Sequence, residues 1–114
     1  DHHGAFEYFS KAAGLGDTEA HLQLSLMYQE GKGVEMNEKK VWHHLEQAAI
    51  GGHSKARHNL AILEEINGRR ARAMKHLIIA ANQGDDGSLN NLKNAYELGY
   101  VSKEDFAAAL RGHQ

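Results

Sequence analysis

The chain contains an internal repeat, and this feature constrains its fold more than any other. Three segments align at offsets of 36 and 32 residues: AFEYFSKAA (5–13), VWHHLEQAA (41–49) and AMKHLIIAA (73–81). A second set aligns in the same frame: EAHLQLSLMYQEG (19–31), KARHNLAILEEIN (55–67) and GSLNNLKNAYELG (87–99). A repeat of this length is typical of stacked helical pairs, in which neighbouring pairs supply the core that one pair cannot build alone.

Equivalent rows of the repeat carry the residue types that packed helices need. One row is leucine in every copy, and another is small in every copy, which lets two helices approach closely. These rows are Leu24, Leu60 and Leu92, and Ala20, Ala56 and Ser88. In the other helix, apolar residues recur at i, i+4 and i+7, which lie on one helix face.

The glycines cluster between stretches of helical length, and the chain has no proline. We expect seven helices, near residues 2–14, 17–30, 38–50, 54–66, 69–83, 86–98 and 102–111. Asp17 is expected to be an N-cap, and Ser102 with Asp105 an approximate capping box. The sequence therefore predicts an all-α fold in a single domain, 1–114. Its expected repeat units are 17–50, 53–83 and 85–111, preceded by a half-repeat helix at 2–14. Because the chain begins with Asp rather than Met, we expect it to be a piece of a longer protein.

These residues resemble the Sel1-like repeat, a relative of the tetratricopeptide repeat. The pattern A-x-x-x-L-x-x-x-Y-x-x-G-x-G-V fits residues 20–34, and the ending K-A-A-x-x-G fits residues 11–16. The resemblance covers nearly the whole chain, and it implies a right-handed α-α superhelix of about three repeats. The second repeat departs from the pattern, because Glu64 stands where the first has Tyr28 and a tight Asn67-Gly68 turn replaces the G-x-G-V loop. The third keeps Tyr96 and ends in a short helix.

The segment Gly31-Lys32-Gly33 resembles a phosphate-binding loop only when its neighbouring residues are ignored. A P-loop follows a strand, has a longer glycine spacing and carries Ser or Thr after the lysine. Here a helix is expected before the loop, and Gly33 follows the lysine. The segment lies where the repeat family places the turn between its two helices, so we interpret it as a turn.

Proteins of this family are generally adaptors, so the resemblance implies a scaffold that binds a peptide or a partner helix on its concave face, with no cofactor. If the leucine row is core, the register places a set of positions on that face, with a lysine at the groove edge. The set is Leu22, Leu26, Gln29, Glu30, Lys55, His58, Ile62, Glu65, Ile66, Asn90, Asn94, Glu97 and Leu98. Its acidic members favour a partner bearing Lys or Arg. The same register fits inter-repeat core for the leucines of the first repeat and both isoleucines, and the pattern does not separate the two interpretations.

Other functions have less support in the sequence. No pair among the nine histidines has the i, i+3 or i+4 spacing that aims two ligands from one helix at a metal. The basic segment NGRRARAMKH (67–76) lacks interleaved aromatics in a chain of net charge −2, so we expect a solvated helix face and no nucleic acid. No nucleophile motif is present, so we predict that the chain is not an enzyme. A metal-binding or enzymatic domain is the third-ranked alternative.

Two further expectations concern partners. The first helix has no helix before it, so the face of Ala5, Phe6 and Phe9 is predicted to be an exposed end that supports self-association or a further repeat. The second-ranked function is a structural segment of a larger repeat protein with no binding site of its own. No apolar run approaches the roughly 20 residues of a membrane span, so no membrane insertion is expected. The sequence leaves the partner and the compartment open.

Overall fold

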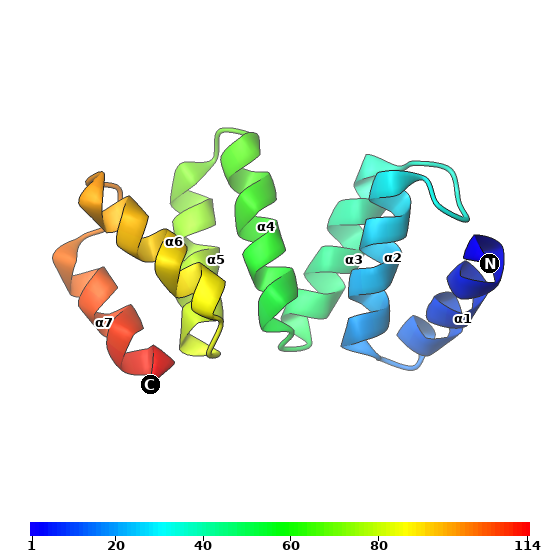
Figure 1. Cartoon of the computed structure of the whole chain (residues 1–114), viewed down its shortest axis with the longest axis horizontal. Helices are drawn as coiled ribbons and strands as arrows, with labels where there is room; N and C mark the ends of the chain where they lie inside the picture. Colours follow the sequence, from blue (N-terminus) through cyan, green and yellow to red (C-terminus); the bar gives the residue numbers. More distant parts are fainter. The chain divides into compact units, whose positions relative to one another are not determined.

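The computed structural model describes all residues, Asp1–Gln114, and it consists of α-helices joined by turns and loops (Figure 1). The seven helices are α1 (His2–Gly14), α2 (Thr18–Glu30), α3 (Glu38–Ile50), α4 (Ser54–Ile66), α5 (Arg70–Asn82), α6 (Asp86–Glu97) and α7 (Lys103–His113). This order confirms the predicted all-α repeat fold, and every boundary lies within two residues of its expected place.

Side-chain caps fix several of these helix boundaries. Asp17 accepts a hydrogen bond from the Ala20 N–H at 3.2 Å, and the Ser102 hydroxyl accepts one from the Asp105 N–H at 3.0 Å. Both caps were expected from the sequence. A cap that the sequence analysis did not find is His53, whose Nδ1 accepts from the Ala56 N–H at 3.2 Å. This bond makes Nε2 the protonated nitrogen of the neutral ring, and Nε2 lies 3.1 Å from Glu19.

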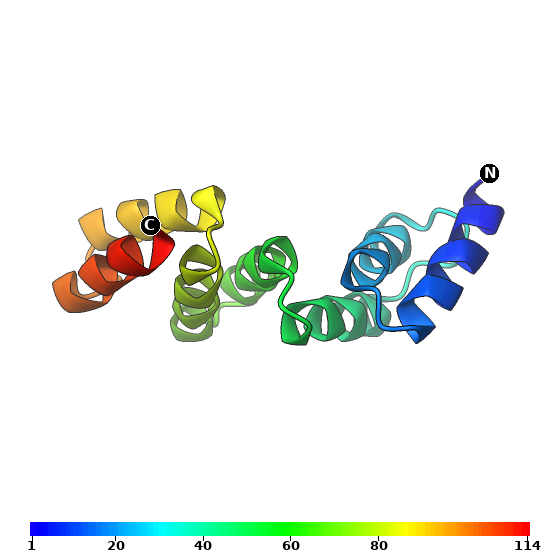
Figure 2. The same cartoon turned by 90° about the horizontal axis from the view of Figure 1, so that it is seen from below.

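The helices gather into two compact units, Asp1–Ala56 and Arg57–Gln114. In the first unit α2 packs against both α1 and α3. In the second unit α5, α6 and α7 pack against one another, and α7 lies beside α6 in both views (Figures 1 and 2).

The start of the first unit differs from the predicted exposed end. Phe6 and Phe9 pack against a buried cluster of Ala13, Ala20 and Leu24, and the Phe6 ring meets Tyr28 edge-on at 5.7 Å. The prediction that these two phenylalanines form an open face is therefore wrong. The face turns toward α2, because α2 supplies the apolar surface that α1 alone lacks.

The loop between α2 and α3 confirms the interpretation of Gly31-Lys32-Gly33 as a turn. Gly31 ends α2 in the left-handed conformation, with φ 69°, and its N–H donates to the Met27 carbonyl at 2.8 Å. Gly33 also has a positive φ, 77°, and a Cβ there would collide with the backbone carbonyl of His2. Glycine is therefore needed at Gly33 both for its backbone conformation and for the approach of α1.

The core of the second unit brings together the predicted rows. It consists of alanines on α4, α5, α6 and α7 around two leucines and a valine, namely Ala61, Ala73, Leu77, Ala81, Leu92, Ala95, Val101 and Ala109. The leucine row is buried in all three repeats. The alanines let the helix backbones approach closely, so the larger side chains fill the space between them.

A buried carboxylate distinguishes the second unit. Glu64, which replaces the tyrosine of the repeat pattern, is only 2% exposed. Arg69 and Arg72 of the α4–α5 hairpin both pair with it, the Arg72 Nε at 2.9 Å from Oε2. His76 Nε2 lies 3.8 Å from the same oxygen, and the Arg57 guanidinium lies 3.4 Å from His76 Nδ1. The acid is therefore compensated by cations, as a buried charge must be.

Candidate functional site

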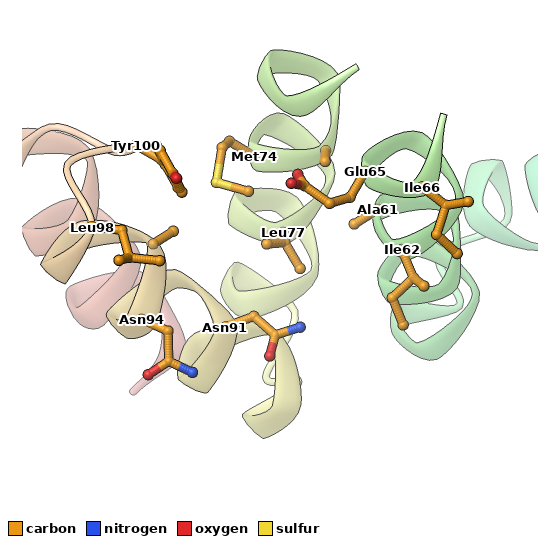
Figure 3. A pocket seen from close by; sticks show the side chains of 12 residues that line it. Ala61, Ile62, Glu65, Ile66, Met74, Leu77, Asn91, Asn94, Leu98 and Tyr100 are labelled. Atoms are coloured by element: carbon orange, nitrogen blue, oxygen red, sulfur yellow. The ribbon is translucent and has the colours of Figure 1, made fainter. Parts of the chain in front are cut away.

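An apolar groove with a volume of about 330 Å³ lies in the second unit. Ile62 and Ile66 on α4 lie on one side of it, Met74 and Leu77 on α5 in the middle, and Leu98 on the other side (Figure 3). The complete lining is Ala61, Ile62, Glu65, Ile66, Ala73, Met74, Leu77, Asn91, Asn94, Ala95, Leu98 and Tyr100.

The groove is bordered by large apolar side chains that the fold leaves in contact with solvent. Ile66 is 74% exposed and Leu98 67% exposed, and Ile62 and Tyr100 are also exposed. Single exposed apolar residues are ordinary, but several around one concavity mark an interaction surface. A ligand that covers them would remove this area from water and gain the hydrophobic contribution.

Glu65 and Tyr100 lie at one end of the groove, and both contact Arg70. Arg70 bonds to Glu65 Oε1 through Nε at 3.0 Å and Nη2 at 2.9 Å, and its guanidinium lies 3.8 Å from the centre of the Tyr100 ring. The bond to Glu65 also raises the pKa of Arg70 above its ordinary value. Because Glu65 already has a cationic partner, it gives little support to the expectation of a Lys- or Arg-bearing ligand.

The other end of the groove carries amides. Asn91 and Asn94 project there from α6 (Figure 3). The Asn91 amide nitrogen lies 3.0 Å from His58 Nε2, and His58 Nδ1 lies 3.0 Å from Asp85 Oδ2. Burial alone would raise the pKa of Asp85, but bonds from Ser88 and the nearby His58 hold it below its ordinary value. The Asn91 amide is therefore linked through His58 to the carboxylate of Asp85, which Ser88 holds in place.

The face predicted from the sequence coincides with this groove in part. Ile62, Glu65, Ile66, Asn94 and Leu98 line it. Leu22 is buried, so it belongs to the core and is removed from the predicted face. The physical reason is that the first helix of a pair is covered on more than one side, so a position two residues from the leucine row also meets a neighbour.

The other predicted positions lie outside the lining of this groove. Leu26 and His58 are half-buried, and the rest are exposed polar residues, namely Gln29, Glu30, Lys55, Asn90 and Glu97. Sequence reasoning missed Met74, Leu77 and Tyr100, because it took the face from the first helix of each pair alone. It also missed Asn91, which is on α6 but lies one residue before the leucine row, outside the register used. Met74 packs on the core of the second unit and also lines the groove.

Comparison with known proteins identifies the repeat. The Sel1 repeat family model matches residues 1–17, 18–53 and 54–85. The chain belongs to the Sel1 repeat family. It is also similar to the crystal structure of a Sel1 repeat protein from Oxalobacter formigenes, at 29% sequence identity and a TM-score of 0.86. The similarity covers 99% of this chain, including the two helices beyond the family-model match, and 35% of that chain, so this chain spans about a third of its length. A comparison with curated proteins found no match.

Membership in the Sel1 repeat family confirms the predicted helical repeat fold and gives the chain a general function. Sel1 repeats are generally protein-interaction modules, and their scaffold is not catalytic. None of the seven helices is both long and apolar enough to cross a membrane.

The basic segment of this Sel1 repeat chain is engaged in ion pairs. Arg69 and Arg72 pair with Glu64, and Arg70 pairs with Glu65. A nucleic-acid surface needs cations that can neutralise phosphates. Here the guanidinium groups neutralise acids on α4 of the same hairpin.

The first unit contains a histidine pair that the sequence spacing did not predict. The Nδ1 atoms of His21 on α2 and His44 on α3 are 3.0 Å apart, so one ring donates a hydrogen bond to the other. Tyr28 stacks on His44 with ring centres 5.6 Å apart. Burial, and then the nearby His43, lower the pKa of both, that of His44 to about 4. Nowhere in the chain do three His, Asp or Glu side chains converge to hold a metal ion.

Proposed function

We propose that this Sel1 repeat chain is an adaptor that binds an apolar segment of a partner protein in the groove between α4, α5 and α6. The observation that supports the proposal is the coincidence of a concavity of about 330 Å³ with four exposed apolar side chains at its border. The lining is apolar in the middle and has a few polar groups at both ends, which is the usual construction of a binding site.

The volume sets the scale of the ligand. A groove of about 330 Å³ has room for a few apolar side chains rather than for a whole domain. The polar ends then set the direction and register of the segment. Glu65 with Arg70 marks one end, and Asn91 with Asn94 marks the other.

The test uses two matched isoleucines. Ile62→Glu places a carboxylate at the groove, whereas Ile50→Glu makes the same change at an exposed residue of the first unit. A peptide is first selected from a random library for binding to the whole chain. It is expected to bind the Ile62→Glu variant at least about tenfold more weakly, because a carboxylate is costly to bury unpaired. Ile50→Glu is expected to bind as the unchanged chain does, measured by isothermal titration calorimetry.

The control is circular dichroism of both variants, since each residue is exposed and both should remain helical. Equal binding to all three proteins would reject the groove as the site. That result would favour the alternative in which this chain is a structural segment of a larger repeat protein.

A further inference from the structure

The amide end of the groove has a defined hydrogen-bond direction. Asp85 caps α6 by accepting from the Ser88 N–H at 2.8 Å and the Ser88 hydroxyl at 2.7 Å, which holds the carboxylate in place. Its Oδ2 lies 3.0 Å from His58 Nδ1. A carboxylate only accepts, so the Nδ1 of His58 carries a proton.

The His58 ring fixes the donor and acceptor roles of the next hydrogen bond, which is to Asn91 in the groove lining. In a neutral ring with a proton on Nδ1, Nε2 is an acceptor, and the Asn91 amide nitrogen donates to it over 3.0 Å. Figure 3 shows the Asn91 nitrogen on the α4 side of the amide and the oxygen turned away from α4. Gly87 makes the arrangement possible, because a Cβ there would lie 2.8 Å from His58 Cε1.

We propose that Asp85 and His58 are positioning residues that orient the Asn91 amide, and that its oxygen accepts a backbone N–H of an extended peptide bound in the groove. This inference rests on the proposed function and specifies the form of its ligand. In the interior of a helix each N–H is already bonded to a carbonyl four residues earlier, so a bound helix has no donor to offer there. An extended segment has free N–H groups beside its apolar side chains.

The experiment measures fluorescence anisotropy with a labelled dodecapeptide selected from a random library on the whole chain. The peptide has blocked ends, so its terminal charges do not contribute to binding. Asn91→Ala is expected to weaken binding about fivefold at pH 7.5. His58→Ala should weaken binding by a similar factor because the Asn91 amide loses its partner, and the two changes together should cost no more than Asn91→Ala alone. Asn94→Ala, also in the groove lining but outside the relay, should leave the effect of His58→Ala unchanged.

A second measurement changes the peptide backbone. Methylating each backbone nitrogen of the peptide in turn should identify one position where binding to the unchanged chain falls about fivefold, and where Asn91→Ala is unaffected. A peptide that depends on Ile62 but not on Asn91, or that binds as a helix by NMR, would overturn this inference and leave the proposed function intact. A peptide that is insensitive to Ile62→Glu would overturn both.

Discussion

Replacing Glu64 by glutamine is expected to lower the free energy of unfolding by about 3 kcal/mol. The substitution keeps the size of the side chain and removes its charge. Glu64 is 2% exposed and faces Arg69, Arg72 and His76, so its loss leaves cations without the acid that compensates them. The arginine side chains are 45% and 69% exposed, so the expected loss comes mainly from the charge-assisted hydrogen bonds that the buried carboxylate accepts.

The neighbouring residue provides the control for this prediction. Glu65 pairs with Arg70 at the surface, so Glu65→Gln should cost no more than about 1 kcal/mol. Urea denaturation followed by circular dichroism measures both, and hydrogen exchange at the amides of α4 and α5 shows whether the second unit is the part that loosens. Similar losses for the two variants would contradict the special role of the buried acid.

Lowering the pH from 7 to 4.5 is expected to destabilise the first unit by about 2 kcal/mol through His44. In the folded chain burial, followed by His43, His21 and Lys40, lowers the pKa of His44 from the ordinary 6.5 to about 4. Between these two values the unfolded chain binds more protons than the folded chain. The stability from His44 is therefore complete above pH 6.5, falls as the pH drops, and levels off below pH 4. The value is reduced from the full linkage energy because the ring is only partly buried.

The measurement compares the unchanged chain with His44→Gln, whose amide can still bond to His21 but does not titrate. Carboxylates titrate in both proteins, so the informative quantity is the difference between their unfolding free energies at pH 7 and at pH 4.5. A difference that does not change with pH would refute the assignment.

Much of the fold was predictable because the repeat uses local signals. Positive-φ glycines such as Gly31 and caps such as Asp17 end and begin the helices, so the sequence marks the boundaries directly. The leucine and alanine rows were identified as core because they recur in every copy. The contacts of Phe6 and Phe9 were not predictable, since they depend on how α1 turns against α2.

The groove was only partly predictable for a different reason. Its α4 side follows from the register of one helix, which gave Ile62, Glu65 and Ile66. Met74 and Tyr100 come from the next helix and from a turn, and their approach depends on packing angles that periodicity does not contain. The bond between His58 and Asn91 joins residues 33 apart in the chain, so no local pattern indicates it.

The buried acid of α4 also limits how repeats of this family can be shuffled. A hybrid array that joins α4 to the second helix of another repeat at the Asn67-Gly68 turn would separate Glu64 from Arg69, Arg72 and His76. Crossovers at the glycine turns after α3 and α5 would keep the hairpin intact. The α4–α5 hairpin is therefore the smallest cassette that gene recombination or protein engineering can exchange while keeping Glu64 with its cations, and the exchange works best where the next repeat also supplies a carboxylate for His58.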